Sequence, residues 1–188
     1  LWWELNGTPT QPVLTVRPEH KFISRGGSIG RASRDPQRVA AFVVRNVERL
    51  VEALNHYHVV CDQLTLSLLF RDAPERAWRV SLLGSTARLE DLRQAALWML
   101  PRAWQPPAAW VNYMHVIAGT LRPDCRRQKS LFEPPRPRQD RLDQLMHEVN
   151  ESVGRFALRS GATLPLADVH TDPANEYDIC DIYGKSCF

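Results

Sequence analysis

The chain has 188 residues, of which 44% are hydrophobic, and a formal net charge of +3. This length and composition suit one domain with appendages, and they exclude a chain that is too polar to form a core. The sequence holds no signal peptide and no apolar run of membrane length. We therefore expect a cytoplasmic, monomeric protein with free thiols that does not contact membranes.

Charged residues are distributed unevenly along the chain. Residues 17–49 hold eight Arg or Lys against three acids, and residues 122–141 hold seven against three. Residues 161–188 reverse this balance, with five acids and one Lys. Two basic stretches and an acidic tail indicate a polyanion-binding face with a separate terminal appendage. The alternative is a basic, solvated surface without a polyanion partner.

The first residues are typical of a linker that enters a domain. Residues 1–19 contain three prolines and one glycine, and they begin with Leu rather than Met, so we expect a piece of a longer protein. A short strand is predicted from His20 to Ser24. In the next residues, Arg25-Gly26-Gly27-Ser28, the glycines would allow backbone N–H groups to converge on an anion.

An amphipathic helix is predicted to begin at Asp35-Pro36, where an N-cap acid precedes proline at the first helical position. Its apolar residues recur at helical spacing: Val39, Phe42, Val43, Val47, Leu50, Val51 and Leu54. This stripe predicts a helix that packs one side against a core.

Two strands and a second helix follow. Residues 64–70 alternate between apolar and polar side chains, which predicts a strand. A turn at 72–75 leads to a strand at 77–83, in which Trp78, Val80 and Leu82 are expected to face the core. A helix is predicted after Thr86, and Pro101 should end it. Residues 111–121 then form the last strand.

The element order predicts an α+β fold, a β-α-β-β-α-β two-layer sandwich whose four-stranded antiparallel sheet carries two helices on one face. The opposite face would stay open, as antiparallel sheets allow. Its predicted residues are Thr65, Ser67, Arg79, Ser81, Tyr113 and His115. A small, polar and cationic surface of this kind fits phosphates without reading bases.

A peptide with its own anchors follows this domain. Gln128-Lys129-Ser130-Leu131-Phe132 lies beside a proline-rich segment, where adjacent Leu and Phe would lower solubility unless a partner's apolar pocket accepts them. It resembles the pentapeptide by which bacterial DNA polymerases and repair proteins bind the sliding clamp, with Lys129 in place of the usual Leu. The alternative is that Leu131 and Phe132 pack into the domain's own core.

Together these segments resemble the C-terminal part of UmuC-like, Y-family translesion DNA polymerases, over about residues 3–166. Residues 21–28 resemble the entry to the little finger, or polymerase-associated, domain, with Phe22 in place of the usual Ser. Residues 126–132 resemble the clamp element, and residues 141–155 resemble the C-terminal extension. The resemblance divides the chain into a linker from an absent thumb domain (1–19), a DNA-binding little finger (20–122), a linker with the clamp-binding peptide (123–139) and an extension (140–188). The extension should hold a helix at about 140–153 and an acidic tail.

The resemblance also implies a role in translesion synthesis, within DNA repair and the SOS response. The open face would lie in the major groove and grip both backbones of the template-primer duplex. The implied DNA contacts are Lys21, Ser24, Arg25, Ser28, Arg79, Ser81 and His115, and the implied clamp contacts are Gln128, Leu131 and Phe132. Family members often carry Arg on the last strand where this chain has Met114 and His115.

No catalytic residues and no cofactor are expected in this chain. Polymerases hold two metal ions with clustered carboxylates on a palm domain. The densest acids here, Asp178 and Asp181, lie in the tail with no strand to fix them. The resemblance places the palm before Leu1, where the parent polymerase would use Mg²⁺.

The nearest alternative is an RNA-recognition-like module that binds single-stranded nucleic acid. Such a module stacks bases on aromatic residues of its central strands, and Tyr113 is the lone aromatic expected on this face. Metal binding by His56, His58 and Cys61, or by Cys180 with Cys187, lacks zinc-site spacing. Cys61 near His58 could form a nucleophile and base pair, but no oxyanion-type glycine turn adjoins it.

Overall fold

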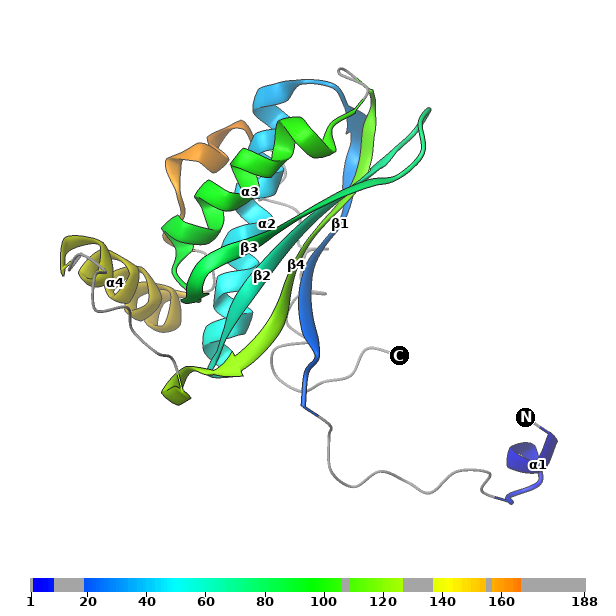
Figure 1. The fold of residues 1–188 in the computed structure, drawn as a ribbon, viewed down its shortest axis with the longest axis horizontal. Coiled ribbons are helices and arrows are strands. Elements are labelled where there is room, and N and C mark those ends of the chain that lie inside the picture. The colour runs from blue at the N-terminus through cyan, green and yellow to red at the C-terminus, as the bar shows by residue number, and fades with distance from the viewer. Residues whose placement is uncertain (1, 9–18, 106–108, 127–136, 155–156, 167–188) are drawn as a thin grey trace.

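The strands form one antiparallel sheet in the order β1-β4-β2-β3 (Figure 1). They are β1 (Phe22–Ser33), β2 (Val59–Phe70), β3 (Arg76–Thr86) and β4 (Val111–Pro123). This computed structural model describes residues 2–8, 19–105, 109–126, 137–154 and 157–166. The helices α2 (Pro36–His56) and α3 (Leu89–Ala103) cover one face of the sheet, and the other face is open. The predicted α+β sandwich is confirmed.

The helices begin where the sequence indicates. The Asp35 side chain accepts a hydrogen bond from the Gln37 N–H at 3.0 Å, so it caps α2 as predicted. The prediction that Pro101 ends the second helix is wrong, because α3 continues to Ala103 with Pro101 inside its last turn. Outside the sandwich lie the short helix α1 (Trp2–Leu5), the 3-10 turn η1 (Asp124–Arg126), the 17-residue helix α4 (Pro137–Val153) and the 3-10 turn η2 (Gly161–Leu166).

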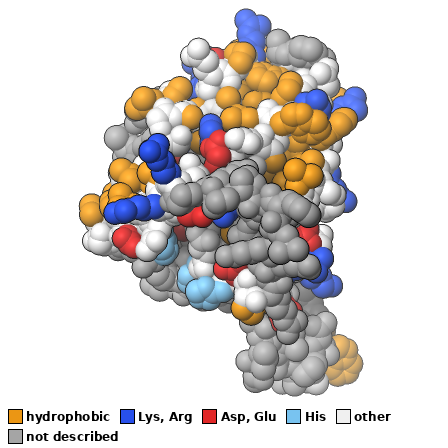
Figure 2. All heavy atoms as spheres, turned by 60° about the vertical axis from the view of Figure 1, so that its left-hand side comes forward, with side chains coloured by type: hydrophobic (Ala, Val, Ile, Leu, Met, Phe, Trp, Pro, Cys, Tyr) orange, Lys and Arg blue, Asp and Glu red, His pale blue; other side chains and the backbone are white. Residues whose placement is uncertain are grey.

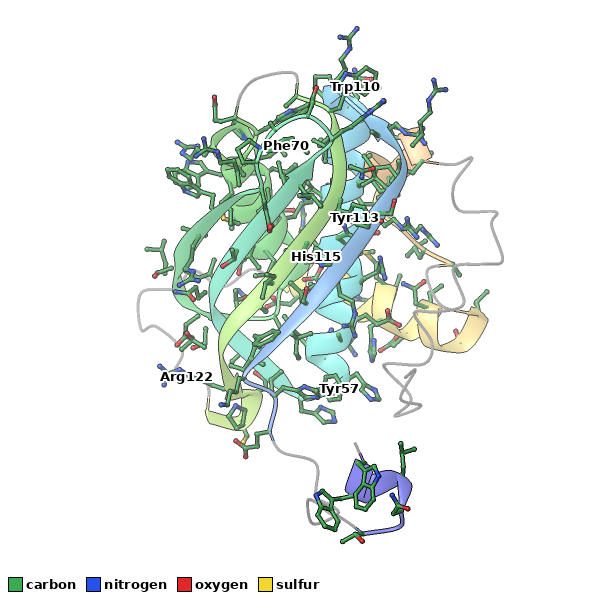
Figure 3. All side chains as sticks on the ribbon, turned by 90° about the vertical axis from the view of Figure 1, so that its right-hand side faces the viewer. Tyr57, Phe70, Trp110, Tyr113, His115 and Arg122 are labelled. Atoms are coloured by element: carbon green, nitrogen blue, oxygen red, sulfur yellow. The ribbon has the colours of Figure 1, made fainter. Side chains whose placement is uncertain are left out.

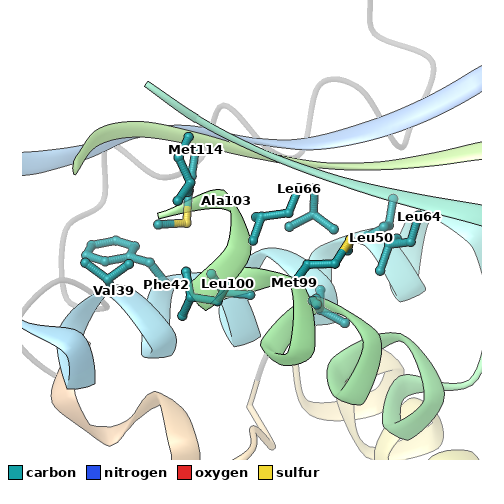
Figure 4. Close-up of a cluster of buried hydrophobic side chains, with 14 of the residues drawn as sticks. Val39, Phe42, Leu50, Leu64, Leu66, Met99, Leu100, Ala103 and Met114 are labelled. Atoms are coloured by element: carbon teal, nitrogen blue, oxygen red, sulfur yellow. The ribbon is translucent and has the colours of Figure 1, made fainter. Parts of the chain in front are cut away.

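Apolar side chains from both layers meet between the sheet and the helices (Figure 4). Val39, Phe42 and Leu50 of α2 and Met99 of α3 face Leu64, Leu66 and Met114 of the sheet, and all are buried. Fully burying one such side chain stabilises the fold by about 1.5–3 kcal/mol. The expected core residues of β3 differ, because Val80 and Leu82 pack on this cluster while Trp78 stays 42% exposed on the edge strand.

The segment that contains η2 covers the outer side of α2, which the sequence leaves polar. The Leu166 side chain is fully buried in the core cluster, and the Glu48 carboxylate of α2 accepts the Ser160 N–H at 2.7 Å. Burial raises the pKa of Glu48 above its usual value, although the Ser160 N–H and the charge of Arg159 oppose this shift. The expectation that the chain from Gly161 is a separable appendage is therefore wrong for residues 161–166. Residues 167–188 lie outside the described residues.

The helix α4 joins this outer layer through polar contacts. Arg88, at the N-terminus of α3, forms an ion pair with Asp140 at 3.0 Å. The Asn150 amide accepts the Leu158 N–H at 2.7 Å and donates to the Leu158 carbonyl at 3.1 Å. These polar contacts involve residues near both ends of α4.

The apolar residues of α4 remain partly open to solvent. Leu142 and Leu145 are about half exposed (49% and 48%). Figure 2 turns this side of the molecule forward and shows hydrophobic side chains among scattered Lys and Arg on its surface. Within the described residues, no helix is long and apolar enough to span a membrane.

The burial of Leu166 yields a matched test of the outer layer. Leu166→Ala should lower the free energy of unfolding by about 2–5 kcal/mol, because it leaves a cavity beside α2. Leu164 is 74% exposed on the same turn, so Leu164→Ala should change stability by less than about 0.5 kcal/mol. Urea unfolding of both full-length variants measures the difference. Equal stability of the two variants would show that residues 161–166 do not belong to the core.

Candidate nucleic-acid interface

The open face is built from residues that alternate with the core residues of each strand. The register places Ser24, Ile117, Thr65 and Arg79 side by side in one row across β1, β4, β2 and β3. The next row is Gly26, His115, Ser67 and Ala77. Figure 3 looks onto this face and shows Tyr113 and His115 along its middle strand. The predicted residues Thr65, Ser67, Arg79, Ser81, Tyr113 and His115 all belong to these rows or to the rows next to them.

Arg25 lies on the other side of the sheet from that face. It pairs with Val116, whose side chain is in the core, and it is only 8% exposed. One of its guanidinium nitrogens donates to the Ser24 carbonyl at 2.8 Å. The interpretation of Arg25 as a phosphate contact on the open face is therefore wrong, because alternation along β1 turns it toward the helices.

The predicted anion-binding loop is also corrected. Gly26, Gly27 and Ser28 are not a turn but part of the long strand β1, where they pair with His115, Met114 and Tyr113. Backbone groups used in this ladder do not converge on an anion. Ser28 is exposed near the end of the paired region, and its hydroxyl accepts the Gly30 N–H at 3.1 Å.

Gly26 is needed for the close approach of β4. A Cβ at this position would lie 2.1 Å from the Met114 carbonyl oxygen and 2.9 Å from the Nδ1 atom of His115. The His115 ring thus lies over Gly26, with its Nδ1 3.5 Å from the Ser24 hydroxyl. The structure brings Ser24 and His115 together at the centre of the face, as part of one polar patch.

The face carries few charges, and they lie near its edges. Lys21 is exposed at the entry to the edge strand β1, and Arg79 is exposed on the opposite edge strand β3, as is Ser81. Ser67 is less accessible than expected, because it is buried and donates to the Glu75 carboxylate at 2.5 Å. Within the described part of the chain, Arg79 makes no ion pair.

Apolar side chains also lie on this face: Tyr113 was predicted there, whereas Phe22 and Leu69 were missed in the sequence. Phe22 is 62% exposed opposite Gly119, while Leu69 and Tyr113 are neighbours and each is 40% exposed. Phe22 and Leu69 could have been found by counting in steps of two from Ser24 and Ser67. The face is therefore mainly polar at its centre, where Ile117 lies among Ser24, Thr65 and His115, and more apolar toward its ends.

At the other end of the sheet, a polar contact ties three strands together. Asp62 of β2 pairs with Arg122 of β4 at 2.6 Å and accepts a hydrogen bond from Ser85 of β3. Desolvation alone would raise the pKa of the Asp62 carboxyl, but the bonds from Ser85 and Arg122 outweigh it and hold this pKa below its usual value. Arg122 is thus engaged in a structural contact.

No cluster with the composition of a metal site occurs among the described residues. The clamp-peptide residues Gln128, Leu131 and Phe132 lie outside the described residues, as do Asp178, Asp181, Cys180 and Cys187.

The geometry agrees with a comparison against protein families. A family model described as the impB/mucB/samB family C-terminal domain matches residues 20–131. The chain belongs to this family. The predicted little finger domain of the UmuC-like, Y-family polymerases is thereby confirmed. No curated protein matches the sequence.

Solved structures that match this chain include the little finger domain of PolIV in complex with the beta-clamp processivity factor. That domain has 14% identity to this chain and a TM-score of 0.45, over 60% of this chain and 99% of its own. A Y-family polymerase chimera of Dbh and Dpo4 has 12% identity and a TM-score of 0.43, over 63% of this chain and 33% of its own. DinB from Sulfolobus solfataricus has 12% identity and a TM-score of 0.40, over 52% of this chain and 28% of its own. This impB/mucB/samB C-terminal domain thus spans about a third of those polymerase chains.

The approach of β4 to Gly26 yields a test of the face. Gly26→Ala should push β1 away from β4 and lower the free energy of unfolding by about 1–3 kcal/mol. Gly84→Ala on β3 is the matched control, because a Cβ there meets nothing within 4 Å, and its effect should stay below about 0.5 kcal/mol. Chemical unfolding gives both values. A stable Gly26→Ala variant would contradict the close packing of His115 over this residue.

Proposed function

We propose that the open face binds the backbone of duplex DNA, as the little finger of a translesion polymerase that grips the template-primer. The observation that carries this proposal is a mainly polar sheet face, left uncovered by the helices, with Arg79 exposed on its β3 edge. Membership of the impB/mucB/samB family supports it. The activity of the whole polymerase, including its use of Mg²⁺, belongs to the same proposal.

The width of the sheet suits a DNA groove. Adjacent strands lie about 4.8 Å apart, so the two edge strands of this sheet are about 14 Å apart. The major groove of B-DNA is about 12 Å wide. A sheet laid over this groove would bring its edges close to the two phosphate backbones. In the central row between them, Thr65, Ile117 and Ser24 offer no amide or Arg fork suited to reading bases, and the neighbouring row contains one amide, that of Gln63.

Charge reversal at one edge tests this proposal. Arg79→Glu should weaken binding to a blunt duplex and reduce the slope of log affinity against log salt by about 0.9, because the variant neutralises one phosphate fewer. Arg102→Glu is the matched control, since Arg102 is exposed on α3 behind the sheet and the charge change is identical. Fluorescence anisotropy of a labelled duplex measures both variants. If Arg102→Glu weakens binding as much as Arg79→Glu, the open face is not the interface.

We further propose that residues 128–132 bind the bacterial sliding clamp, a proposal that rests on the sequence pattern. Leu131 and Phe132 would enter an apolar cleft of the clamp, with the Gln128 amide held at its edge. Burying the two apolar side chains contributes about 3–6 kcal/mol before ordering costs, which corresponds to a Kd of about millimolar to tens of micromolar, so the isolated peptide should bind only weakly.

Two variants with opposite expected effects test clamp binding. Leu131→Ala combined with Phe132→Ala should remove binding to immobilised clamp without changing thermal unfolding. Lys129→Leu, which restores the usual residue of the pattern, should strengthen binding several-fold by adding apolar contact. Surface plasmon resonance measures both. Unfolding of the double variant would place these side chains in the domain's own core instead.

A further inference from the structure

A second group of cationic side chains gathers at one end of the sheet, away from the centre of the open face. Val111, the first residue of β4, pairs with Ser33 at the end of β1 and with Phe70 at the end of β2. The residues one step beyond these pairs are Arg34, Trp110 and Arg71, so they are neighbours in space. We call them the arginine rim, and Figure 3 shows Trp110 and Phe70 at this end of the sheet.

Trp110 is held through its backbone and by one arginine over its ring. The Arg34 guanidinium lies over its ring, 5.1 Å from the ring centroid. The Arg71 N–H donates to the Trp110 carbonyl at 2.8 Å, and the Trp110 N–H donates to the Asp72 carboxylate at 3.3 Å. The backbone of Trp110 is thus fixed, and Arg34 restrains its ring on one side, so the ring loses part of its freedom before a ligand stacks on it.

Further arginines flank the rim. Arg31 of β1 and Arg76 at the start of β3 are exposed near the same end of the sheet, and α2 begins there with the positive end of its dipole. Among the described residues, Arg31, Arg71 and Arg76 form no ion pair.

Nearby carboxylates have other partners. Asp35 accepts the Gln37 N–H, Asp72 accepts the Trp110 N–H, and Glu75 accepts the Ser67 hydroxyl. These acids reduce the local charge, but they do not occupy the N–H donors of the rim arginines. The donors therefore remain available to an anionic ligand.

We infer that the arginine rim binds single-stranded DNA, with Arg34 and Arg71 on its phosphates and an unpaired base against Trp110. A combination of arginines and a fixed aromatic ring is what single strands need, because each unpaired base offers a face for stacking. A duplex hides those faces inside its stack. This inference rests on the proposed function, because the strand would continue from the duplex held on the neighbouring open face.

Two probes separate the rim from the open face. A short fluorescent oligothymidylate, which forms no duplex, reports on the rim, and a blunt-ended duplex reports on the open face. Arg34→Gln with Arg71→Gln should weaken oligothymidylate binding about tenfold and lower its salt slope by about 1.4, or about 0.7 for each phosphate that is no longer neutralised. Duplex binding by this variant should stay within about twofold of the wild type. Arg79→Gln should give the reverse pattern.

The role of the ring is tested by a conservative rescue. Trp110→Leu should weaken oligothymidylate binding about fivefold or more, whereas Trp110→Phe should restore most of it, because a phenyl ring can still stack. Thermal unfolding checks that both variants keep the fold, which is expected since Trp110 makes its hydrogen bonds through the backbone.

Several outcomes would overturn the inference. Unchanged oligothymidylate affinity in the double variant would remove the rim as the site, and equal weakening for both probes would show a general effect of charge. Equal binding of a polyglutamate peptide would show that the rim selects anions rather than nucleic acid. If the oligothymidylate results are as expected but Arg79→Gln does not weaken duplex binding, the proposed function of the open face is contradicted and the rim remains a binding site.

Discussion

The insertion of β4 between β1 and β2 is the constraint on which both faces of this domain depend. Val116 of β4 pairs with Arg25 on one side and with Leu66 on the other, so within the sheet β1 and β2 are joined through this strand. Alternate residues of β4 serve the core and the open face in turn. The surface on which the helices pack and the candidate interface are therefore formed by the same strand, and a shift in its register would disturb both.

Much of the fold could be predicted because local patterns and tertiary packing agree. The alternation of β2 and the cap at Asp35 placed elements that the structure contains. The same alternation, continued along β1, would have put Arg25 beside the helices, but a glycine-rich segment was interpreted as a loop. The burial of Leu166 could not be predicted, since residues 161–166 have no period and the Glu48 side of α2 has the polarity of a solvated surface.

The acids around the sheet explain how a domain of modest net charge can still present cationic surfaces. Glu75, Asp72 and Asp62 each accept hydrogen bonds from a hydroxyl, a backbone amide or a guanidinium. Of these three acids, only Asp62 forms an ion pair with an arginine, Arg122. This pair links β2 and β4 at the end of the sheet opposite the arginine rim. Carboxylates used in this way hold the scaffold while exposed arginines such as Arg79 and Arg71 keep their donors toward solvent.

The strand order also sets the sequence of events during synthesis. When β1, α2 and the β2–β3 hairpin have left the ribosome, β1 has no partner and one side of β2 is open, because the strand that fills the space between them comes later in the chain. Unpaired edges of this kind invite pairing with other chains. These edges stay unpaired until residues 111–123 have been synthesised, so β4 both completes the core and removes two sites of unwanted pairing.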